Sequence, residues 1–171
     1  QRLRAAMNKH LLDADRGIYI DGIRDDGTPS PKTTLHASVF PLHFGVARKA
    51  DVPHIVSLIR RERLNCGIYA APYVLGGLWR AGHGELAYEL LICEDRHSWY
   101  EMLRSGATAT MEAWAPELKW NTSWCHPAGG TPVWLIITRL MGLRPATPGF
   151  GTLRVAPQFP GDLRRIEVGF P

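Results

Sequence analysis

Apolar residues recur at three- and four-residue intervals along most of the first 143 positions of the chain. Because this spacing puts them on one face of a helix, it predicts a mainly helical fold. Short and long connections alternate between the helices, which suggests a helical array or toroid built from hairpins. No unit of about 33 to 47 residues repeats, so a TPR or ankyrin solenoid is not predicted. The expected helices cover residues 3–11, 36–46, 51–59, 72–81, 84–93 and 131–142.

A few positions mark where these helices begin, end or meet. Asp51 can cap the helix that follows it. The glycine pair at 76–77 allows another helix to approach closely. The threonine–proline pair at 131–132 predicts a helix start, with a capping hydroxyl followed by proline in the first turn, and Gly142 is the matching stop.

The sequence changes character after Gly142, where prolines and glycines become frequent. Two short runs, 152–155 and 164–168, alternate as strands do. Two strands cannot bury a core of their own. We therefore expect residues 145–171 to form a linker and the start of a β-domain, and the chain to be a piece cut at both ends from something longer.

Composition narrows the classes of function. Hydrophobic residues make up 45% of the 171 positions and charged residues 21%, as in globular proteins. The net charge is +4 and the pI about 9.2, but the basic residues are scattered, and the densest cluster, 60–63, has the position of a solvated helix face. The sequence contains no run of 18 apolar residues, so a membrane-spanning helix is not predicted. The three cysteines form no CxxC pair, so free thiols are expected rather than a zinc ribbon or a disulfide framework.

One carboxylate, Glu112, lies among small residues and threonines in the segment GATATMEAW (106–114). Gly106 and the two threonines disfavour a long helix, so we expect a loop or a helix entrance. The carboxylate could cap a helix, or it could act as a general base or nucleophile. The second role needs a raised or poised pKa, which flanking apolar rings can supply.

Five of the six tryptophans fall between Trp99 and Trp134. Trp120 and Trp124 lie in polar, loop-like sequence, where a core role is less natural. Indole faces stack on the C–H bonds of sugars, so tryptophans beside a carboxylate favour a carbohydrate site, with core packing as the alternative. His126 has no second histidine at ligand spacing, so a metal site is not predicted. Its imidazole is structural, holds a sugar hydroxyl or orients the nearby carboxylate.

Three segments in fixed order resemble the C-terminal part of the bacterial α-L-rhamnosidases, glycoside hydrolase family 78: GATATMEAW, NTSWCHPAGGTPVWLI and GLRPATPGFGTLRVAPQFPGDL. Two more, SPKTTLHASVFPLHFGV and YAAPYVLGGLWRAGHGELAYELL, resemble hairpin helices of that family's (α/α)6 barrel. The resemblance implies that residues 1–144 are the C-terminal half of the catalytic six-hairpin barrel. Residues 145–171 would then be a linker and the first strands of a C-terminal β-sandwich.

The resemblance also implies roles for individual residues. Glu112 matches the general base, which activates the water that attacks the anomeric carbon, and His126 matches a histidine that contacts the sugar. Candidates for the pocket wall are Trp114, Trp120 and Trp124. The family's general acid is an upstream glutamate in an acidic, arginine-rich motif that residues 1–98 do not contain. We therefore expect the chain to supply the base without the acid and to be inactive alone.

The function expected from this resemblance is hydrolysis of terminal non-reducing α-L-rhamnosyl residues by an inverting mechanism with two carboxyl groups. The alternatives are a six-hairpin glycosidase of different sugar specificity, a non-catalytic sugar-binding relative and, more remotely, a helical nucleic-acid-binding protein. The expected partners are a rhamnose-containing glycoside or oligosaccharide and the missing N-terminal part of the barrel or an oligomeric partner. Nucleic acid, a membrane, a metal site in this chain and a cofactor are not expected. A structural calcium elsewhere in the full-length protein is compatible with this function.

Overall fold

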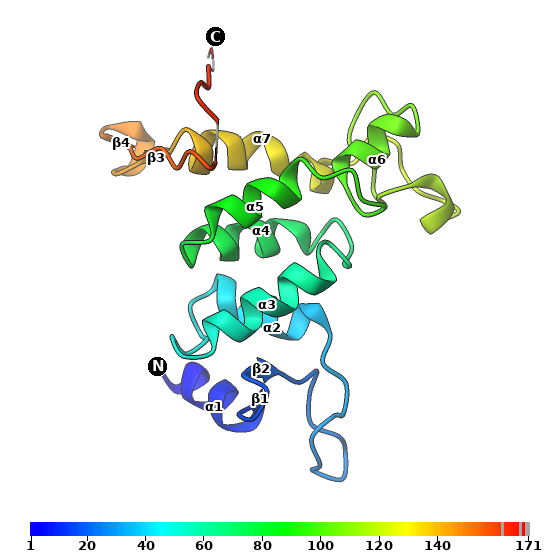
Figure 1. Cartoon of the computed structure of the whole chain (residues 1–171), viewed down its shortest axis with the longest axis vertical. Helices are drawn as coiled ribbons and strands as arrows, with labels where there is room; N and C mark the ends of the chain where they lie inside the picture. Colours follow the sequence, from blue (N-terminus) through cyan, green and yellow to red (C-terminus); the bar gives the residue numbers. More distant parts are fainter. Residues whose placement is uncertain (162, 168, 170–171) are drawn as a thin grey trace. The chain divides into compact units, whose positions relative to one another are not determined.

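The computed structural model of the chain describes residues 1–161, 163–167 and 169. It divides into two compact units, Gln1–His83 and Gly84–Pro171. Figure 1 labels the helices and strands of both units, which are described separately below. The predicted boundary at 144/145 is a different division and stays a prediction.

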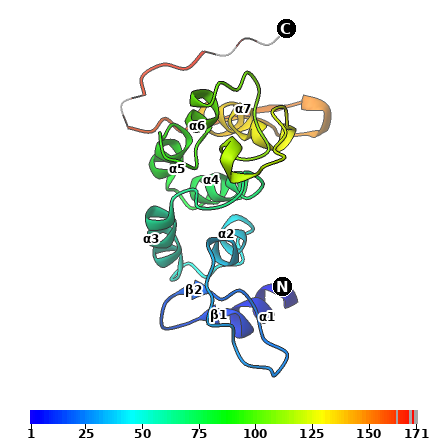
Figure 2. The same cartoon turned by 90° about the vertical axis from the view of Figure 1, so that its right-hand side faces the viewer.

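The first unit is mainly helical, as the apolar spacing predicted. Its one small sheet pairs two antiparallel strands, with Leu12 opposite Tyr19. This hairpin lies between the first two helices, as the two views in Figures 1 and 2 agree. The elements are α1 (Arg2–His10), β1 (Leu12–Asp13), β2 (Ile18–Tyr19), α2 (Leu35–His43), α3 (Val52–Glu62) and α4 (Ala71–Arg80).

The core of the first unit is built around α4, most of which is buried. Helix α2 packs against it at the predicted glycine pair. A Cβ on Gly76 would lie 2.8 Å from Cε1 of His43, and a Cβ on Gly77 would lie 3.4 Å from the backbone nitrogen of the same histidine. Trp79 is 3% exposed in this core. The predicted close approach of a second helix is therefore confirmed, and only a residue without a side chain allows it.

We expect Gly76→Val to destabilise the first unit by about 1–3 kcal/mol, because the new side chain has to displace the His43 ring in a packed interface. Urea denaturation followed by circular dichroism measures the change. Gly67→Val is the matched control, since a Cβ at Gly67 meets nothing within 4 Å, and it should stay within about 0.5 kcal/mol of the parent. Equal losses in the two variants would contradict the packing explanation.

Helix α3 begins after Asp51 as predicted, but the carboxylate does not cap it. Both oxygens of Asp51 instead accept hydrogen bonds from the guanidinium of Arg48, at 2.5 and 2.8 Å. This contact lowers the pKa of Asp51, outweighing the effect of burial, which raises it. The guanidinium, three residues upstream, holds both carboxylate oxygens in a bidentate ion pair, which is the stronger alternative to a single bond from a backbone N–H.

The second unit contains short helices and a second two-stranded sheet. The predicted helix from 131 begins at Thr131, continues as a π-helix, and ends before Gly142, whose φ is +68°. The Thr131 hydroxyl donates to the carbonyl of Ala128 at 3.4 Å and is not a cap. The elements are α5 (Gly84–Leu91), α6 (Trp99–Arg104), η1 (Pro116–Leu118), η2 (Pro127–Gly130), α7 (Thr131–Leu135), η3 (Ile136–Leu140), β3 (Leu143–Pro145), η4 (Pro148–Phe150) and β4 (Leu153–Val155).

The strand predicted at 152–155 exists as β4, but its partner is β3. No strand was predicted at 143–145, where the predicted barrel meets the predicted linker. Residues 164–167 form no strand, and the end of that predicted run, Val168, lies outside the described residues. The turn that starts the sheet depends on Gly142, since a Cβ there would lie 1.9 Å from the carbonyl oxygen of Ala156.

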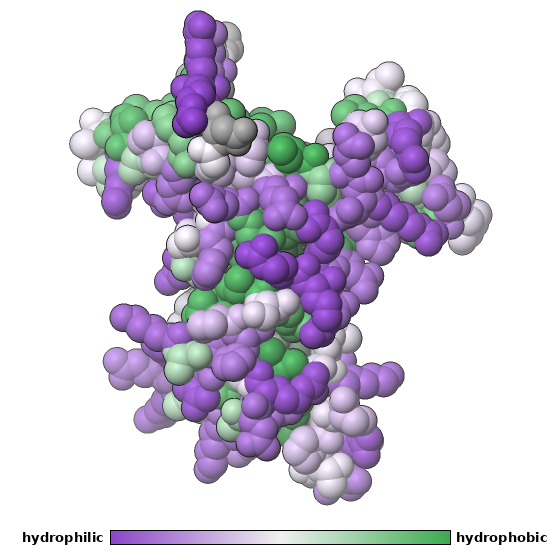
Figure 3. Space-filling view, in the orientation of Figure 1, coloured by the Kyte–Doolittle hydropathy of each residue, from purple (hydrophilic) through white to green (hydrophobic). Residues whose placement is uncertain are grey.

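Large apolar side chains of α7, η4 and β4 are exposed to solvent. Figure 3 shows hydrophobic residues at the surface over the segment that contains α7 and the β3–β4 sheet. Such exposure indicates a surface that other parts of a protein cover. The exposed residues are Val133, Trp134, Phe150, Leu153 and Val155.

The three cysteines are thiols rather than disulfides, as predicted, but they differ in environment. Cys66 is buried, and burial raises the pKa of its thiol to about 12. Cys93 is half-buried and Cys125 is exposed. Among the residues that the structure describes, none of the helices combines the length and apolar character that crossing a membrane requires.

Candidate active site

A buried pair of tryptophans anchors the segment that carries Glu112. Ser98 caps α6 by accepting a hydrogen bond from the backbone N–H of Glu101 at 3.1 Å, which fixes Trp99 in the first turn. The indole N–H of Trp99 donates to the carbonyl of Gly129 at 2.7 Å. Its ring meets Trp114 edge-on, with centroids 4.9 Å apart and planes at 89°. One side chain thus ties α6 both to the Glu112 segment and to η2.

The residues around Glu112 and His126 are held together by backbone pairing. The N–H of Glu112 donates to the carbonyl of Ser123 at 2.9 Å, and the N–H of His126 donates to the carbonyl of Thr110 at 2.7 Å. The Thr110 hydroxyl donates to the carbonyl of His126 at 3.0 Å. Between these two pairings, one residue on the first segment (111) opposes two on the second (124–125), as in a β-bulge. The two predicted site residues therefore sit on adjoining, antiparallel stretches of backbone.

Gly129 explains why this pairing is so close. It is buried, and a Cβ at this position would lie 2.7 Å from the Cβ of Thr110 and 2.9 Å from the carbonyl oxygen of Met111. Gly129 therefore lets η2 lie directly against the Glu112 segment.

The Glu112 carboxylate is paired with a cation. Nζ of Lys119 lies 2.6 Å from Oε2, and the backbone N–H of Ser123 donates to the same oxygen at 3.2 Å. The Glu112 side chain is 20% exposed. The Lys119 contact and the hydrogen bond from the Ser123 N–H lower the pKa of Glu112, outweighing burial, which raises it. Flanking rings therefore do not raise this pKa, because the group nearest to the carboxylate is an ammonium.

A lowered pKa decides which chemistry suits Glu112. At neutral pH the carboxyl group is ionised, so it can accept a proton but has none to donate. A general acid needs the opposite shift. The arrangement is compatible with a base or an electrostatic role, and not with an acid.

The imidazole of His126 is oriented by the backbone of η2. Its Nδ1 accepts a hydrogen bond from the N–H of Ala128 at 3.2 Å, so His126 is the N-cap of η2. An accepting Nδ1 leaves the proton of the neutral ring on Nε2. Nε2–H is then a donor that a hydroxyl of a bound sugar could accept.

The tryptophans predicted to line a pocket divide into two kinds. Trp114 is 2% exposed and lies in the core against Trp99, so it offers no open face to a sugar in this structure. Trp120 is 94% exposed and Trp124 is 47% exposed. Sugar stacking stays a prediction for these two indoles only.

Lys119 is the site residue that the sequence analysis missed. The segment that joins it to Glu112 is an irregular loop with the 3₁₀ turn η1, so no regular helix or strand brings the two side chains together. Only the backbone pairing of 112 with 123 brings the intervening loop back on itself.

Replacing Lys119 with methionine should raise the pKa of Glu112 toward its ordinary value of 4.5. Because folding lowers this pKa, the ion pair stabilises the native state above the ordinary value of 4.5. This contribution to stability is lost as the pH falls through the folded-state pKa. Lys119→Met should therefore lose stability at neutral pH relative to the parent and little at strongly acidic pH. NMR titration of the Glu112 carboxyl measures the shift, with Lys9→Met on exposed α1 as the control. An unchanged Glu112 titration in Lys119→Met would contradict the ion pair.

Within the described residues, no group of three or more histidine, cysteine, aspartate or glutamate side chains could hold a metal ion.

Comparison with known proteins identifies the family. The family model described as the bacterial alpha-L-rhamnosidase 6 hairpin glycosidase domain matches residues 1–140. This match covers most of the chain. The chain belongs to this family. The resemblance seen in the sequence motifs is thereby confirmed.

The individual relatives agree with the family. An alpha-L-rhamnosidase of Alteromonas sp. (strain LOR) is 29% identical over 176 residues, which covers 95% of this chain and 19% of that protein. The structure of alpha-L-rhamnosidase from Dictyoglumus thermophilum superposes with a TM-score of 0.76 at 22% identity, covering 94% of this chain and 18% of that one. The crystal structure of Streptomyces avermitilis alpha-L-rhamnosidase complexed with L-rhamnose gives 0.71 at 24% identity, covering 94% and 16%.

These structural similarities confirm the predicted fold class, a mainly helical part of a six-hairpin glycosidase followed by strands. The chain spans about a fifth of the length of the relatives that it matches.

Proposed function

We propose that this chain is part of a glycoside hydrolase that removes terminal non-reducing α-L-rhamnosyl residues, and that Glu112 is its general base. Membership of the family and the relatives named alpha-L-rhamnosidase support the reaction class. The Streptomyces avermitilis relative was crystallised with L-rhamnose, which supports rhamnose as the sugar.

The observation that carries the proposal is the ionised Glu112 carboxylate, held by backbone pairing on the stretch that adjoins His126. Inverting hydrolysis needs such a base about 6.5–9.5 Å from a general acid, with a water between the base and the anomeric carbon. Glu112 would take a proton from this water while the oxygen of the water bonds to the anomeric carbon. The leaving oxygen would take a proton from the general acid, and the configuration would invert.

In this mechanism His126 and the exposed indoles bind the sugar. Nε2–H of His126 would donate to a sugar hydroxyl, and Trp120 or Trp124 would cover an apolar face of the ring. The general acid would come from outside residues 1–171. The missing part of the barrel, or an oligomeric partner, would supply it. Residues 1–144 would be barrel and 145–171 the linker and entry to a β-sandwich.

The Lys119 contact sets a condition on this mechanism. A carboxylate held 2.6 Å from an ammonium is a weakened base. The catalytic state would therefore have a water, rather than Lys119, against the reacting oxygen of Glu112. Contacts in a substrate-free site commonly rearrange in this way when the substrate binds.

The same ion pair favours one other candidate, a non-catalytic sugar-binding protein in which Lys119 holds Glu112 permanently. That candidate predicts rhamnose binding that survives Glu112→Gln, with no hydrolysis even when the barrel is complete. Calorimetric titration of L-rhamnose into the parent and the variant, followed by an activity assay, separates the two candidates.

The proposal is tested with aryl glycosides. We expect hydrolysis of an aryl α-L-rhamnoside, and not of aryl glucosides, by a protein that joins this chain to the rest of its barrel. The 171-residue chain alone should give no turnover. Preference for another aryl glycoside would assign a different sugar to the site. Turnover by the isolated chain would refute the proposal that the general acid comes from outside residues 1–171.

A further inference from the structure

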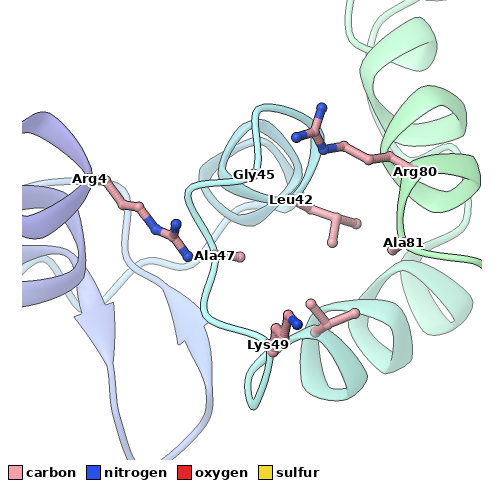
Figure 4. A pocket seen from close by; sticks show the side chains of 8 residues that line it. Arg4, Leu42, Gly45, Ala47, Lys49, Arg80 and Ala81 are labelled. Carbon is pink, nitrogen blue, oxygen red and sulfur yellow. The ribbon is translucent and has the colours of Figure 1, made fainter. Parts of the chain in front are cut away.

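The first unit contains a cavity that the mechanism above does not use. Its volume is about 470 Å³, and all the residues that line it belong to Gln1–His83. This volume lies within the range of pockets for small molecules, roughly 300–1,000 Å³. Figure 4 shows side chains from α1, α4 and the α2–α3 connection converging on it. The lining residues are Arg4, Leu42, Gly45, Ala47, Lys49, Val52, Arg80 and Ala81.

Every charged residue of the lining is a cation. Arg4, Lys49 and Arg80 come from three different parts of the unit, and no acidic residue joins them. A cavity of this volume spans roughly 10 Å, close to the Debye length of about 8 Å at physiological ionic strength, so the three charges repel one another with only partial screening. An anion in the cavity would relieve this repulsion.

The neighbouring acid does not neutralise these cations. Asp51, just beyond the lining residues of the α2–α3 connection, has both its oxygens bonded to Arg48. Within the described part of the chain, the ion pairs involve other cations than Arg4, Lys49 and Arg80.

Two features give the cavity a defined shape. Gly45, with φ +69°, leaves room for Arg80: a Cβ there would lie 2.9 Å from Nη2 of the guanidinium. The remaining wall is apolar, formed by Leu42, Ala47, Val52 and Ala81. A ligand that fits therefore combines a negative group with a compact body that has an apolar face.

We propose that this cavity binds a small organic oxyanion: a phosphate, sulfate or carboxylate group carried on a compact body such as a sugar. Arginine forks match the geometry of such groups, and a lysine adds a point charge. The proposal does not depend on the role of Glu112, since none of the residues that line the cavity belongs to the second unit.

The test is calorimetric titration of the full 171-residue chain with glucose 6-phosphate, glucuronate, inorganic phosphate and inorganic sulfate, with uncharged glucose as the ligand control. We expect the anions to bind, glucose not to bind, and affinity to fall with added salt. Arg80→Gln and the double variant Arg4→Gln/Lys49→Gln should each weaken glucose 6-phosphate binding about five- to tenfold or more.

Arg60→Gln is the matched control, because it removes one exposed positive charge from α3 outside the cavity. Circular dichroism checks that each variant folds. Tighter binding of glucose 6-phosphate than of inorganic phosphate would support the role of the apolar wall as well. No binding of any anion, equal binding of glucose, or an equal loss in Arg60→Gln would overturn the proposal.

Discussion

Glu112→Gln should lower kcat for an aryl α-L-rhamnoside by about 10²–10⁴-fold, the usual contribution of a general base. The assay requires a protein that joins this chain to the rest of its barrel. The amide keeps the size of the side chain and can still accept from the N–H of Ser123, but it cannot take a proton from water. KM should change little, since Glu112 acts on the water rather than on the sugar.

Glu117→Gln is the matched control, an exposed acid in η1 five residues away. It should retain the parent kcat. Added azide should restore turnover in Glu112→Gln only, because azide attacks the anomeric carbon without a base and yields the β-L-rhamnosyl azide. Full activity in Glu112→Gln would end the assignment of this residue as the base.

Trp99→Ala should destabilise the second unit by about 3–5 kcal/mol, as expected for truncating a buried tryptophan. The substitution removes the edge-on contact with Trp114 and leaves the carbonyl of Gly129 without its 2.7 Å hydrogen bond. Because η2 then loses its anchor, the imidazole of His126 should also become mobile. Urea denaturation measures the first effect, and the line widths of the His126 ring in NMR spectra measure the second.

Trp120→Ala provides the control for this experiment, since the side chain is 94% exposed. Its stability should stay within about 0.5 kcal/mol of the parent. Trp99→Phe keeps most of the apolar contact but loses the indole N–H, so it should cost about 1–3 kcal/mol. If Trp120→Ala cost as much as Trp99→Ala, the anchoring role of Trp99 would be wrong.

The helices were predictable because their evidence is local. Apolar spacing predicted α2 and α4, and the glycine pair in α4 correctly predicted a close approach of another helix, which the structure identifies as α2. The cap of α3 was not predictable in the same way, because Arg48 and the backbone compete for the Asp51 carboxylate. The folded geometry decides this competition in favour of Arg48. The partner of β4 was missed because β3 is a three-residue strand containing a proline.

The candidate site was predictable in its residue types but not in its electrostatics. Glu112 and His126 lie in motifs that resemble those of a family, and the structure places their two segments side by side. The direction of the Glu112 pKa depends on Lys119, which reaches it through an irregular loop. Whether a tryptophan faces solvent or core also depends on tertiary packing, which is why Trp114 differs from Trp120.

The different environments of the thiols should allow Cys125 to be labelled selectively. A thiol with a pKa of about 12 supplies almost no thiolate at neutral pH, so Cys66 should not react with a maleimide reagent. Cys125 is exposed between Trp124 and His126, and should react first. A fluorophore attached there would sit beside two side chains proposed to touch sugar, and its emission would report arrival of a ligand without any need for turnover.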